Sequence, residues 1–385
     1  MKKIILLLCL GLLISGCTNE KASAPTIKIG LIAELTGSIP AVGASCRNAA
    51  LLAVKIINAD GGLDVGGKKY PIELVIQDSG AKPEQAAAIA QKLITQDRVL
   101  AIIGPNSSSN AIPASEIAEK AQVVLITPWS TNPKTTINIR TGQPKKYVFR
   151  ACFTDVFEGR VLANFATDTL RVKKVAILYD IASDVLKSQA EQFQKYFTAK
   201  GGVIVACETY TGGDKDFSAQ LTKIKRAQPE ILFAPSYYTD VPLEVAQAHR
   251  LGLKIPFLGS DAWSTEDLIK MSGPAVEGFY FSNHYSPNSN NPVTKAYVAA
   301  YQAAYSNTPD DIAALTADAF GLLFQALTMS GKLDRQALRN SLSQLRSYQG
   351  VTGNISFFGT GDPIKGAVIL QIKNGKFVWF ADALP

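Results

Sequence analysis

Short apolar runs alternate along the chain with longer stretches of helical character. The short runs have the length and composition of buried strands. In the first part of the chain, the predicted strands are residues 27–33, 72–78, 99–104 and 123–126. The predicted helices among them include residues 43–59 and 83–97. Strands that alternate with helices are typical of a parallel sheet covered on both faces.

A second series of the same kind begins after residue 150. Its predicted strands are residues 175–179, 203–208, 231–234 and 257–259. Helices are then expected from 292 to 345, before strands at 355–358, 367–372 and 376–379. About 370 residues remain after the leader described below, which exceeds the usual size of one hydrophobic core. We therefore expect an α/β protein with two doubly wound, Rossmann-like lobes.

Polar residues follow several of the predicted strands. In open parallel sheets, ligands bind beyond the carboxyl ends of the strands. The polar strand ends are the serines 107–109, the segment I-T-P-W-S-T-N-P at 126–133, Tyr237 and Asp261. The serines precede a predicted helix, so they could be a nucleophile, an anion cradle or a plain helix cap.

The first residues resemble a bacterial lipoprotein leader. Two lysines precede an apolar run too short for an ordinary membrane span, and small residues stand directly before Cys17. We interpret residues 1–16 as a signal peptide and Cys17 as the lipidated residue. The polar residues 17–25 are expected to form a tether.

The net charge and the cysteine content exclude few classes of protein. Loss of residues 1–16 removes Lys2 and Lys3, so the formal net charge falls from +7 to +5. No basic block is present, which argues against a nucleic-acid partner. Cys46, Cys152 and Cys207 would remain in the mature chain, as one disulfide and one thiol or as three thiols.

Catalytic and cofactor motifs are missing from the sequence. The chain has only two histidines, and no G-x-S-x-G motif surrounds the serines. Residues 62–69, G-L-D-V-G-G-K-K, come near a phosphate-binding loop, but Lys69 stands where that loop needs Ser or Thr. We interpret this segment as a surface turn. We expect no cofactor, no bound metal and no enzymatic activity.

The polar strand ends together suit an α-amino acid. Ser108, Ser130 and Thr131 can donate hydrogen bonds to a carboxylate, and a helix start favours negative charge. Asp261, in the second series of strands, offers a carboxylate to an ammonium group. Tyr237 offers an aromatic wall with a polar tip. The combination predicts a site for a zwitterion between the lobes.

The chain resembles the branched-chain amino-acid-binding family of type I periplasmic binding proteins. The matching segments, in family order, are I-K-I-G-L-I-A-E-L-T-G, A-V-K-I-I-N-A-D-G-G-L, I-I-G-P-N-S-S-S, T-P-W-S-T-N-P, Y-V-F-R-A-C-F-T-D-V-F-E-G, D-K-D-F-S-A-Q-L-T-K-I, A-H-R-L-G-L and L-G-S-D-A-W. The resemblance implies two lobes joined by three hinge crossovers that close on a ligand. It places lobe I at 26–149 with 281–350, and lobe II at 150–280 with 351–385.

The resemblance also implies roles for the polar strand ends. Ser108 matches the family's carboxylate-binding serine, with Ser130 and Thr131 beside it. Trp129 stands where a backbone carbonyl commonly accepts from the ammonium. Tyr237 matches the cleft tyrosine, and Asp261 matches the acidic ammonium partner.

Two positions depart from the family pattern. Family members usually have a small residue in place of Trp129, and they usually carry an aromatic residue within the segment that is 181–185 here. The indole could compensate for the missing ring in one pocket, or it could point away toward the hinge. The family fold also places Cys46 and Cys152 near the cleft rims, and we hypothesise a disulfide between them.

The function expected from the resemblance is that of a substrate-binding lipoprotein of an ABC importer. It would be anchored to the membrane through Cys17 on the outside of the cytoplasm, as a monomer. It would bind a free L-amino acid, branched-chain or otherwise apolar, and deliver it to the permease subunits. The alternative is a binding protein that reports an amino acid or a small carboxylate to a signalling partner.

Overall fold

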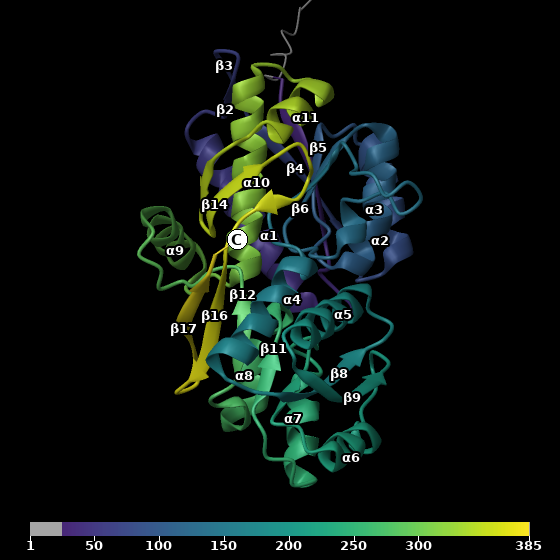
Figure 1. Cartoon of the computed structure of the whole chain (residues 1–385). Coiled ribbons are helices and arrows are strands. Elements are labelled where there is room, and N and C mark those ends of the chain that lie inside the picture. Colours follow the sequence, from purple (N-terminus) through teal and green to yellow (C-terminus); the bar gives the residue numbers. More distant parts are fainter. Residues whose placement is uncertain (1–24, 385) are drawn as a thin grey trace, which may run out of the picture.

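The computed structural model describes residues 25–384 as two α/β lobes (Figure 1). The predicted signal peptide, the expected lipidation site Cys17 and all but the last residue of the predicted tether lie outside the described residues. The first lobe is built on a parallel five-stranded sheet. In spatial order its strands are β4 (Ile72–Asp78), β1 (Ile27–Ala33), β5 (Ala101–Ile103), β6 (Val124–Thr127) and β7 (Val148–Arg150).

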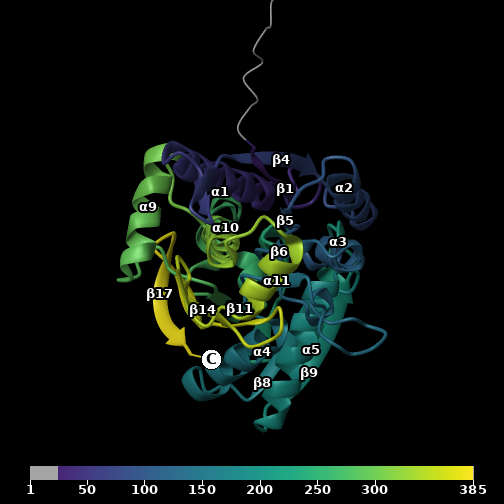
Figure 2. The same ribbon diagram turned by 90° about the horizontal axis from the view of Figure 1, so that it is seen from above.

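Helices cover the first sheet. They are α1 (Pro40–Ala59), α2 (Pro83–Thr95), α3 (Ser108–Ala121), α9 (Pro292–Tyr305), α10 (Asp311–Ser330) and α11 (Arg335–Ser343). Figure 2 shows α10 near the middle of the lobe, beside α1 and α11. Helices α1 and α10 are long and apolar enough to cross a membrane, but they pack together here as core helices of the lobe.

The second lobe is built on a seven-stranded sheet. In spatial order its strands are β17 (Lys376–Ala383), β16 (Ala367–Lys373), β12 (Tyr280–Asn283), β11 (Phe257–Gly259), β10 (Ile231–Phe233), β8 (Lys174–Asp180) and β9 (Val203–Tyr210). Only the pairs that involve β16 are antiparallel. The helices of this lobe are α4 (Asp155–Asn164), continued by a π-helical turn at Phe165–Thr169, α5 (Asp184–Ala199), α6 (Ser218–Ala227), α7 (Val241–Arg250) and α8 (Asp267–Ser272). The predicted fold class is confirmed.

Small elements complete the chain. They are a hairpin of β2 (Leu63–Val65) and β3 (Lys68–Tyr70), a sheet of β13 (Tyr348–Gly350), β14 (Gly353–Phe357) and β15 (Pro363–Ile364), and 3₁₀ turns at Pro133–Thr135, Asp261–Trp263 and Gly273–Val276. The β2–β3 hairpin contains the segment interpreted as a surface turn, so that interpretation is confirmed.

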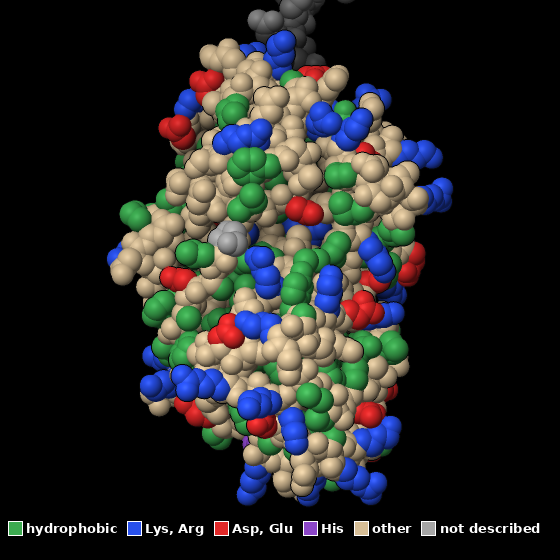
Figure 3. All heavy atoms as spheres, in the orientation of Figure 1, with side chains coloured by type: hydrophobic (Ala, Val, Ile, Leu, Met, Phe, Trp, Pro, Cys, Tyr) green, Lys and Arg blue, Asp and Glu red, His purple; other side chains and the backbone are tan. Residues whose placement is uncertain are grey.

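The chain crosses between the two sheets three times. It leaves the first lobe after β7, returns after β12, and leaves again between β15 and β16. The predicted lobe boundaries stay a prediction. One of them, at residue 281, falls within strand β12, and the whole of β12 belongs to the second sheet. On the face drawn in Figure 3, lysine and arginine side chains are dispersed over both lobes among acidic ones.

Candidate functional site

Five of the six predicted site residues meet in one cavity between the lobes. We call this the ligand cavity. It is lined by Ser107, Ser108, Trp129, Thr131, Val185, Tyr237, Asp261 and Ala262. They lie at or just beyond the carboxyl ends of β5, β6, β8, β10 and β11, where the strand-end argument expects a ligand. The sixth predicted residue, Ser130, is buried but does not line the cavity.

A tight turn after β5 brings the serines to the cavity. Gly104 has a φ of +87°, and a Cβ there would lie 2.1 Å from the carbonyl oxygen of Ile32. Only glycine fits this turn, since a side chain would collide with the backbone of the neighbouring strand. The turn leads through Ser107, which precedes the first residue of α3, to Ser108 at the helix start.

Ser108 is held as a hydrogen-bond donor toward the cavity. Its Oγ accepts from the Ser130 hydroxyl at 3.0 Å and from the Asn132 backbone N–H at 3.3 Å. A hydroxyl oxygen has two lone pairs, so the proton of Ser108 is left to donate elsewhere. Ser130 therefore acts behind the cavity wall, and it orients Ser108.

The carboxylate of Glu34 binds the loop before helix α3. Its carboxylate accepts from the backbone N–H groups of Asn106 at 3.1 Å and Ser107 at 3.0 Å, and from the Ser107 hydroxyl at 3.2 Å. These donors are thus not free for an anionic ligand, in contrast to a plain anion cradle. Sequence reasoning missed Glu34, although its position directly after β1 is another polar strand end.

A buried arginine fixes the loop that carries Trp129 and Thr131. Arg150 lies on β7 with no exposed surface. Its guanidinium donates to the carbonyl oxygens of Ser130 and Asn132 and, at 2.7 Å, to the Thr136 hydroxyl. Its Nε donates to Asp362 at 2.7 Å. The planar fork of arginine suits such simultaneous contacts, so Arg150 sets the conformation of the loop.

Trp129 lines the cavity and faces the second lobe. Its ring centroid lies 6.4 Å from that of Tyr237, at an interplanar angle of 44°. Val185, in the segment without an aromatic residue, lines the same cavity. Of the two readings of Trp129, the structure therefore favours the compensating one. Within residues 25–384, neither the indole Nε1 of Trp129 nor the Oγ1 of Thr131 has a hydrogen-bond partner, although both atoms are buried.

Asp261 is held from three sides at the end of β11. Its two carboxylate oxygens contact Gln189 Nε2 at 2.7 Å and His284 Nε2 at 2.9 Å. Its backbone N–H donates to Glu158 at 2.8 Å. The local chain is fixed by Trp263, whose ring packs on Gly259 and whose Nε1 donates to the Ala234 carbonyl.

Carboxyl groups accumulate around Asp261. Burial raises the pKa of Glu158 to about 8 and that of Asp155 to about 6. Burial, followed by the charge of Glu158, raises the pKa of Asp261 well above its usual range. Burial also lowers the pKa of His284, so the histidine does not supply a stable positive charge here. A cation placed beside Asp261 would favour its ionised form.

The lobes touch across the cavity. Asn132 Nδ2 donates to the Asp184 carbonyl oxygen, and Lys134 Nζ pairs with the Asp184 carboxylate, both at 2.8 Å. The ligand cavity has a volume of only about 10 Å³ in this arrangement. The structure is thus a closed arrangement, and a ligand can enter only when the lobes separate.

The hypothesised disulfide between Cys46 and Cys152 is wrong for this structure. Both residues are buried free thiols, and Cys207 is an exposed free thiol. Burial raises the pKa of the Cys46 and Cys152 thiols to about 12 each, which keeps them protonated and unreactive.

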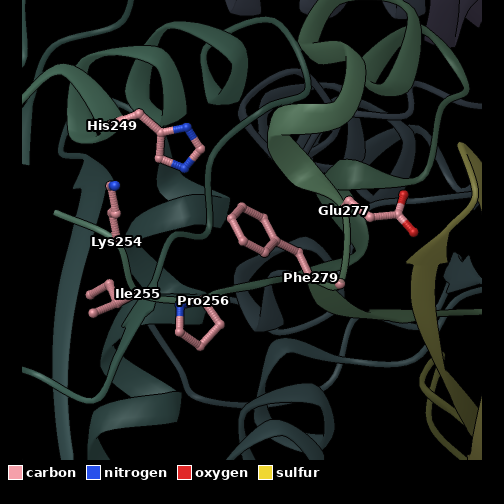
Figure 4. A pocket seen from close by; sticks show the side chains of 7 residues that line it. His249, Lys254, Ile255, Pro256, Glu277 and Phe279 are labelled. Carbon is pink, nitrogen blue, oxygen red and sulfur yellow. The ribbon is translucent and has the colours of Figure 1, made fainter. Parts of the chain in front are cut away.

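Another pocket lies at the opposite end of β11 from the ligand cavity. It has a volume of about 450 Å³ and lies at the amino ends of β11 and β12. His249 and Lys254 lie on one side of the Phe279 ring, and Glu277 lies on the other side and points away from it (Figure 4). None of the predicted site residues takes part in it.

Comparison with known proteins identifies the family. Residues 26–376 match the family described as periplasmic binding protein. The leucine-, isoleucine-, valine-, threonine- and alanine-binding protein of Pseudomonas aeruginosa is 29% identical over 374 residues, 96% of this chain and 94% of that protein.

Two solved structures share the whole architecture. The leucine-binding protein LivK of Thermotoga maritima superposes with a TM-score of 0.86 at 33% identity, over 94% of this chain and 99% of that one. The branched-chain amino-acid transporter substrate-binding protein LivJ of Streptococcus pneumoniae, solved with isoleucine, gives 0.84 at 32% identity over the same shares. The chain therefore belongs to the branched-chain amino-acid-binding family of type I periplasmic binding proteins.

Proposed function

We propose that the protein binds a free L-amino acid in the ligand cavity. One observation carries the proposal: uncharged donors line the cavity on the first lobe, and buried carboxyl groups stand on the second. A zwitterion with adjacent carboxylate and ammonium groups matches both sides at once. Neither a simple anion nor a neutral sugar would satisfy the acidic side.

The ligand's α-carboxylate belongs on the first lobe. The free proton of Ser108 and the unpartnered Oγ1 of Thr131 point to an acceptor there. Arg150 lies behind these donors, and its positive charge adds to the field that a carboxylate would meet. Hydrogen bonds to a charged group contribute about 1.5–3 kcal/mol each.

The ligand's ammonium group belongs on Asp261. Each carboxylate oxygen of Asp261 has one protein partner, and each can accept a second hydrogen bond. The ammonium would supply the positive charge that the cluster of carboxyls lacks. After the costs of ordering the ligand and closing the lobes, an affinity near micromolar, about −8 kcal/mol, is reasonable.

The ligand's side chain meets an apolar wall. Trp129, Val185 and Tyr237 surround the remaining space, which is small. We infer a branched-chain or another apolar amino acid, in line with the leucine and isoleucine named for the two solved relatives.

The wider role is uptake through an ABC importer. The family is extracytoplasmic, and the relative solved with isoleucine is named as a transporter component. We propose that the protein is a monomer, anchored through a lipid on Cys17, and that it delivers its ligand to the permease subunits. Mass spectrometry of the full chain from bacterial membranes should show a lipid-modified Cys17 at the amino terminus, and Cys17→Ser should release the protein.

A thermal-shift panel tests the binding proposal. Purified protein is unfolded and refolded to remove carried ligand, then heated with each of the twenty L-amino acids. A ligand at a hundred times its dissociation constant stabilises by about 2.7 kcal/mol. We expect shifts from one or a few apolar amino acids. Silence from all twenty, with a shift from a carboxylate that lacks an amino group, would contradict the role of Asp261.

A further inference from the structure

A second cavity lies where the chain crosses between the lobes. We call it the hinge pocket. It has a volume of about 860 Å³ and is lined by residues from the segments 284–294, 351–356, 364–368 and 378–384. These segments include parts of two of the three crossings, next to α9, β14 and β17 (Figure 1). The volume lies within the range of about 300–1,000 Å³ typical of small-molecule sites.

The His284 side chain links the two cavities. Its Nε2 contacts Asp261 of the ligand cavity at 2.9 Å, and its ring stacks on Phe153 with centroids 3.8 Å apart. The same side chain lines the hinge pocket, with 1% of its surface exposed. Within residues 25–384, its Nδ1 has no hydrogen-bond partner. A buried ring nitrogen without a partner is costly, so a ligand atom in the pocket would relieve it.

Lys365 places a cation in the lining of the same pocket. Its side chain is buried, and its Nζ donates to the Ala151 carbonyl at 3.1 Å and to the Thr352 hydroxyl at 2.6 Å. An ammonium group has three donors, so one is left for an acceptor. Burial lowers the pKa of Lys365 to about 8, and an anionic partner would restore its charge.

Other parts of the hinge-pocket lining are rich in amides and hydroxyls. They include Ser286, Asn288, Ser289, Asn290 and Asn354. Trp379 adds an aromatic face, and its Nε1 donates to Asp382 at 2.9 Å. Amide, hydroxyl and aromatic groups together suit a ligand that carries several hydroxyls and some apolar ring or chain surface.

We propose that the hinge pocket is a second binding site, for a small polyhydroxylated carboxylate such as a sugar acid. The carboxylate of the ligand binds the third donor of Lys365. A hydroxyl meets Nδ1 of His284, since a hydroxyl can donate or accept and so fits either tautomer of the ring. Further hydroxyls bind the amides of the wall.

Occupation of the hinge pocket should strengthen binding in the ligand cavity. The pocket exists in the closed arrangement, and opening the lobes must move its walls because crossing segments form them. A ligand that fits this shape therefore favours closure. His284 adds a direct link, since it holds Asp261 with one nitrogen and faces the pocket with its ring. This coupling, unlike the site itself, rests on the proposed amino-acid function.

Calorimetry with D-gluconate, D-glucose and hexanoate tests the site without any amino acid. Gluconate carries both carboxylate and hydroxyls, glucose lacks the carboxylate, and hexanoate lacks the hydroxyls. We expect gluconate to bind about tenfold or more tighter than either, the value of a lost charge-assisted hydrogen bond. Equal binding of glucose or hexanoate, or no binding of gluconate, would overturn the assignment.

A matched pair of variants locates the binding. Val378→Trp puts a large ring on the pocket wall, and Lys376→Trp puts the same ring on the same strand outside the pocket. Both positions are on the edge strand β17, so neither change should prevent folding. Gluconate affinity should fall only in Val378→Trp. Equal affinity in both variants would show that gluconate binds elsewhere.

The coupling is measured as the affinity for L-leucine with and without saturating gluconate. We expect an increase of about fivefold or more, and by linkage leucine should raise gluconate affinity by the same factor. His284→Gln can keep a donor near Asp261 but removes Nδ1, so it should weaken gluconate binding and the coupling. Gluconate binding without any effect on leucine would overturn the coupling and leave the site.

Discussion

The two walls of the ligand cavity are built in opposite ways. On the first lobe, neutral hydroxyls face the cavity. The charged groups Arg150 and Glu34 are buried behind them, Arg150 paired with Asp362 and Glu34 bound by the loop before α3. On the second lobe, Asp261 itself lines the cavity, and Glu158 and Asp155 are buried close by. One wall can receive negative charge, and the other lacks positive charge.

Under the proposed function, this difference makes the small cavity selective for a ligand that carries both a carboxylate and an ammonium group. The donors of the first lobe are fixed in advance by Arg150 and Ser130, so a carboxylate meets a prepared surface. Burial raises the pKa of the carboxyls of the second lobe, and a cation beside them would favour their ionised form. The ligand that would complete both walls is a zwitterion. Four substitutions and one measurement of proton release test how far the two walls differ.

Asp261→Asn should have the largest effect on binding. The amide keeps the shape of the side chain but removes the charge that receives the ammonium. We expect a loss of about 2–5 kcal/mol, as for other truncated buried charge pairs. Calorimetry with L-leucine measures it, and Asp267→Asn, on exposed helix α8, is the matched control. Equal affinity in the two variants would remove Asp261 from the site.

Arg150→Met should damage the first wall and the fold together. Methionine fills much of the space but leaves the carbonyl oxygens of Ser130 and Asn132 without their donor. We expect about 3 kcal/mol lower free energy of unfolding, in the range for a broken buried charge network. Urea denaturation measures it, with the surface change Arg339→Met as control. A stable variant with native affinity would show that the loop does not depend on Arg150.

Leucine binding should release protons through the second wall. In the empty protein, Asp261 holds its proton above the usual pH range, and the ligand's ammonium favours the ionised form. Affinity should therefore rise as the pH increases toward the raised pKa of Asp261 in the empty protein, by at most about 1.4 kcal/mol per unit. Calorimetry in buffers of different ionisation enthalpy counts the protons. Proton uptake, or the same release in Asp261→Asn, would contradict this mechanism.

Thr131→Val should separate binding from stability on the first wall. The buried Oγ1 has no partner within residues 25–384, so its removal should leave the unfolding free energy unchanged or slightly higher. Leucine affinity should fall by about 1.5–3 kcal/mol, the value of one hydrogen bond to a charged group. Thr136→Val, whose hydroxyl contacts Arg150 and Asp362, should show the reverse pattern. A loss of stability without a loss of affinity in Thr131→Val would refute its placement.

Lys134→Met should have the smallest effect. Its ion pair with Asp184 bridges the lobes at 2.8 Å but is about half exposed, so water and salt screen it. We expect leucine affinity to change by less than about 1 kcal/mol, and less still at high salt. A larger loss would mean that closure, rather than the two walls, dominates the binding energy.

Sequence alone predicted the parts of the site that follow strands. Ser108, Trp129, Thr131, Tyr237 and Asp261 stand next to apolar runs, and parallel sheets gather such residues at one edge. Ser130 follows the same strand as Trp129 and Thr131, but its side chain does not line the cavity. The direction of that side chain depends on the loop conformation, which the buried guanidinium of Arg150 fixes.

The supporting residues could not be predicted in the same way. Glu158 and Gln189 lie on helices, 103 and 72 residues before Asp261 in the chain, and His284 lies in a crossing segment. No local pattern marks them, because packing between distant elements brings them together. The same holds for the hinge pocket, whose walls come from four separate segments.

The most direct test of the two-wall account compares three ligands that carry the same branched side chain. They are L-leucine, its analogue without the amino group, 4-methylpentanoate, and its analogue without the carboxylate, 3-methylbutylamine. Calorimetry should show tight binding of leucine and a loss of at least about tenfold for each analogue, since each leaves one wall unsatisfied. If 4-methylpentanoate binds as tightly as leucine, the acidic wall does not recognise an ammonium group, and the account is wrong.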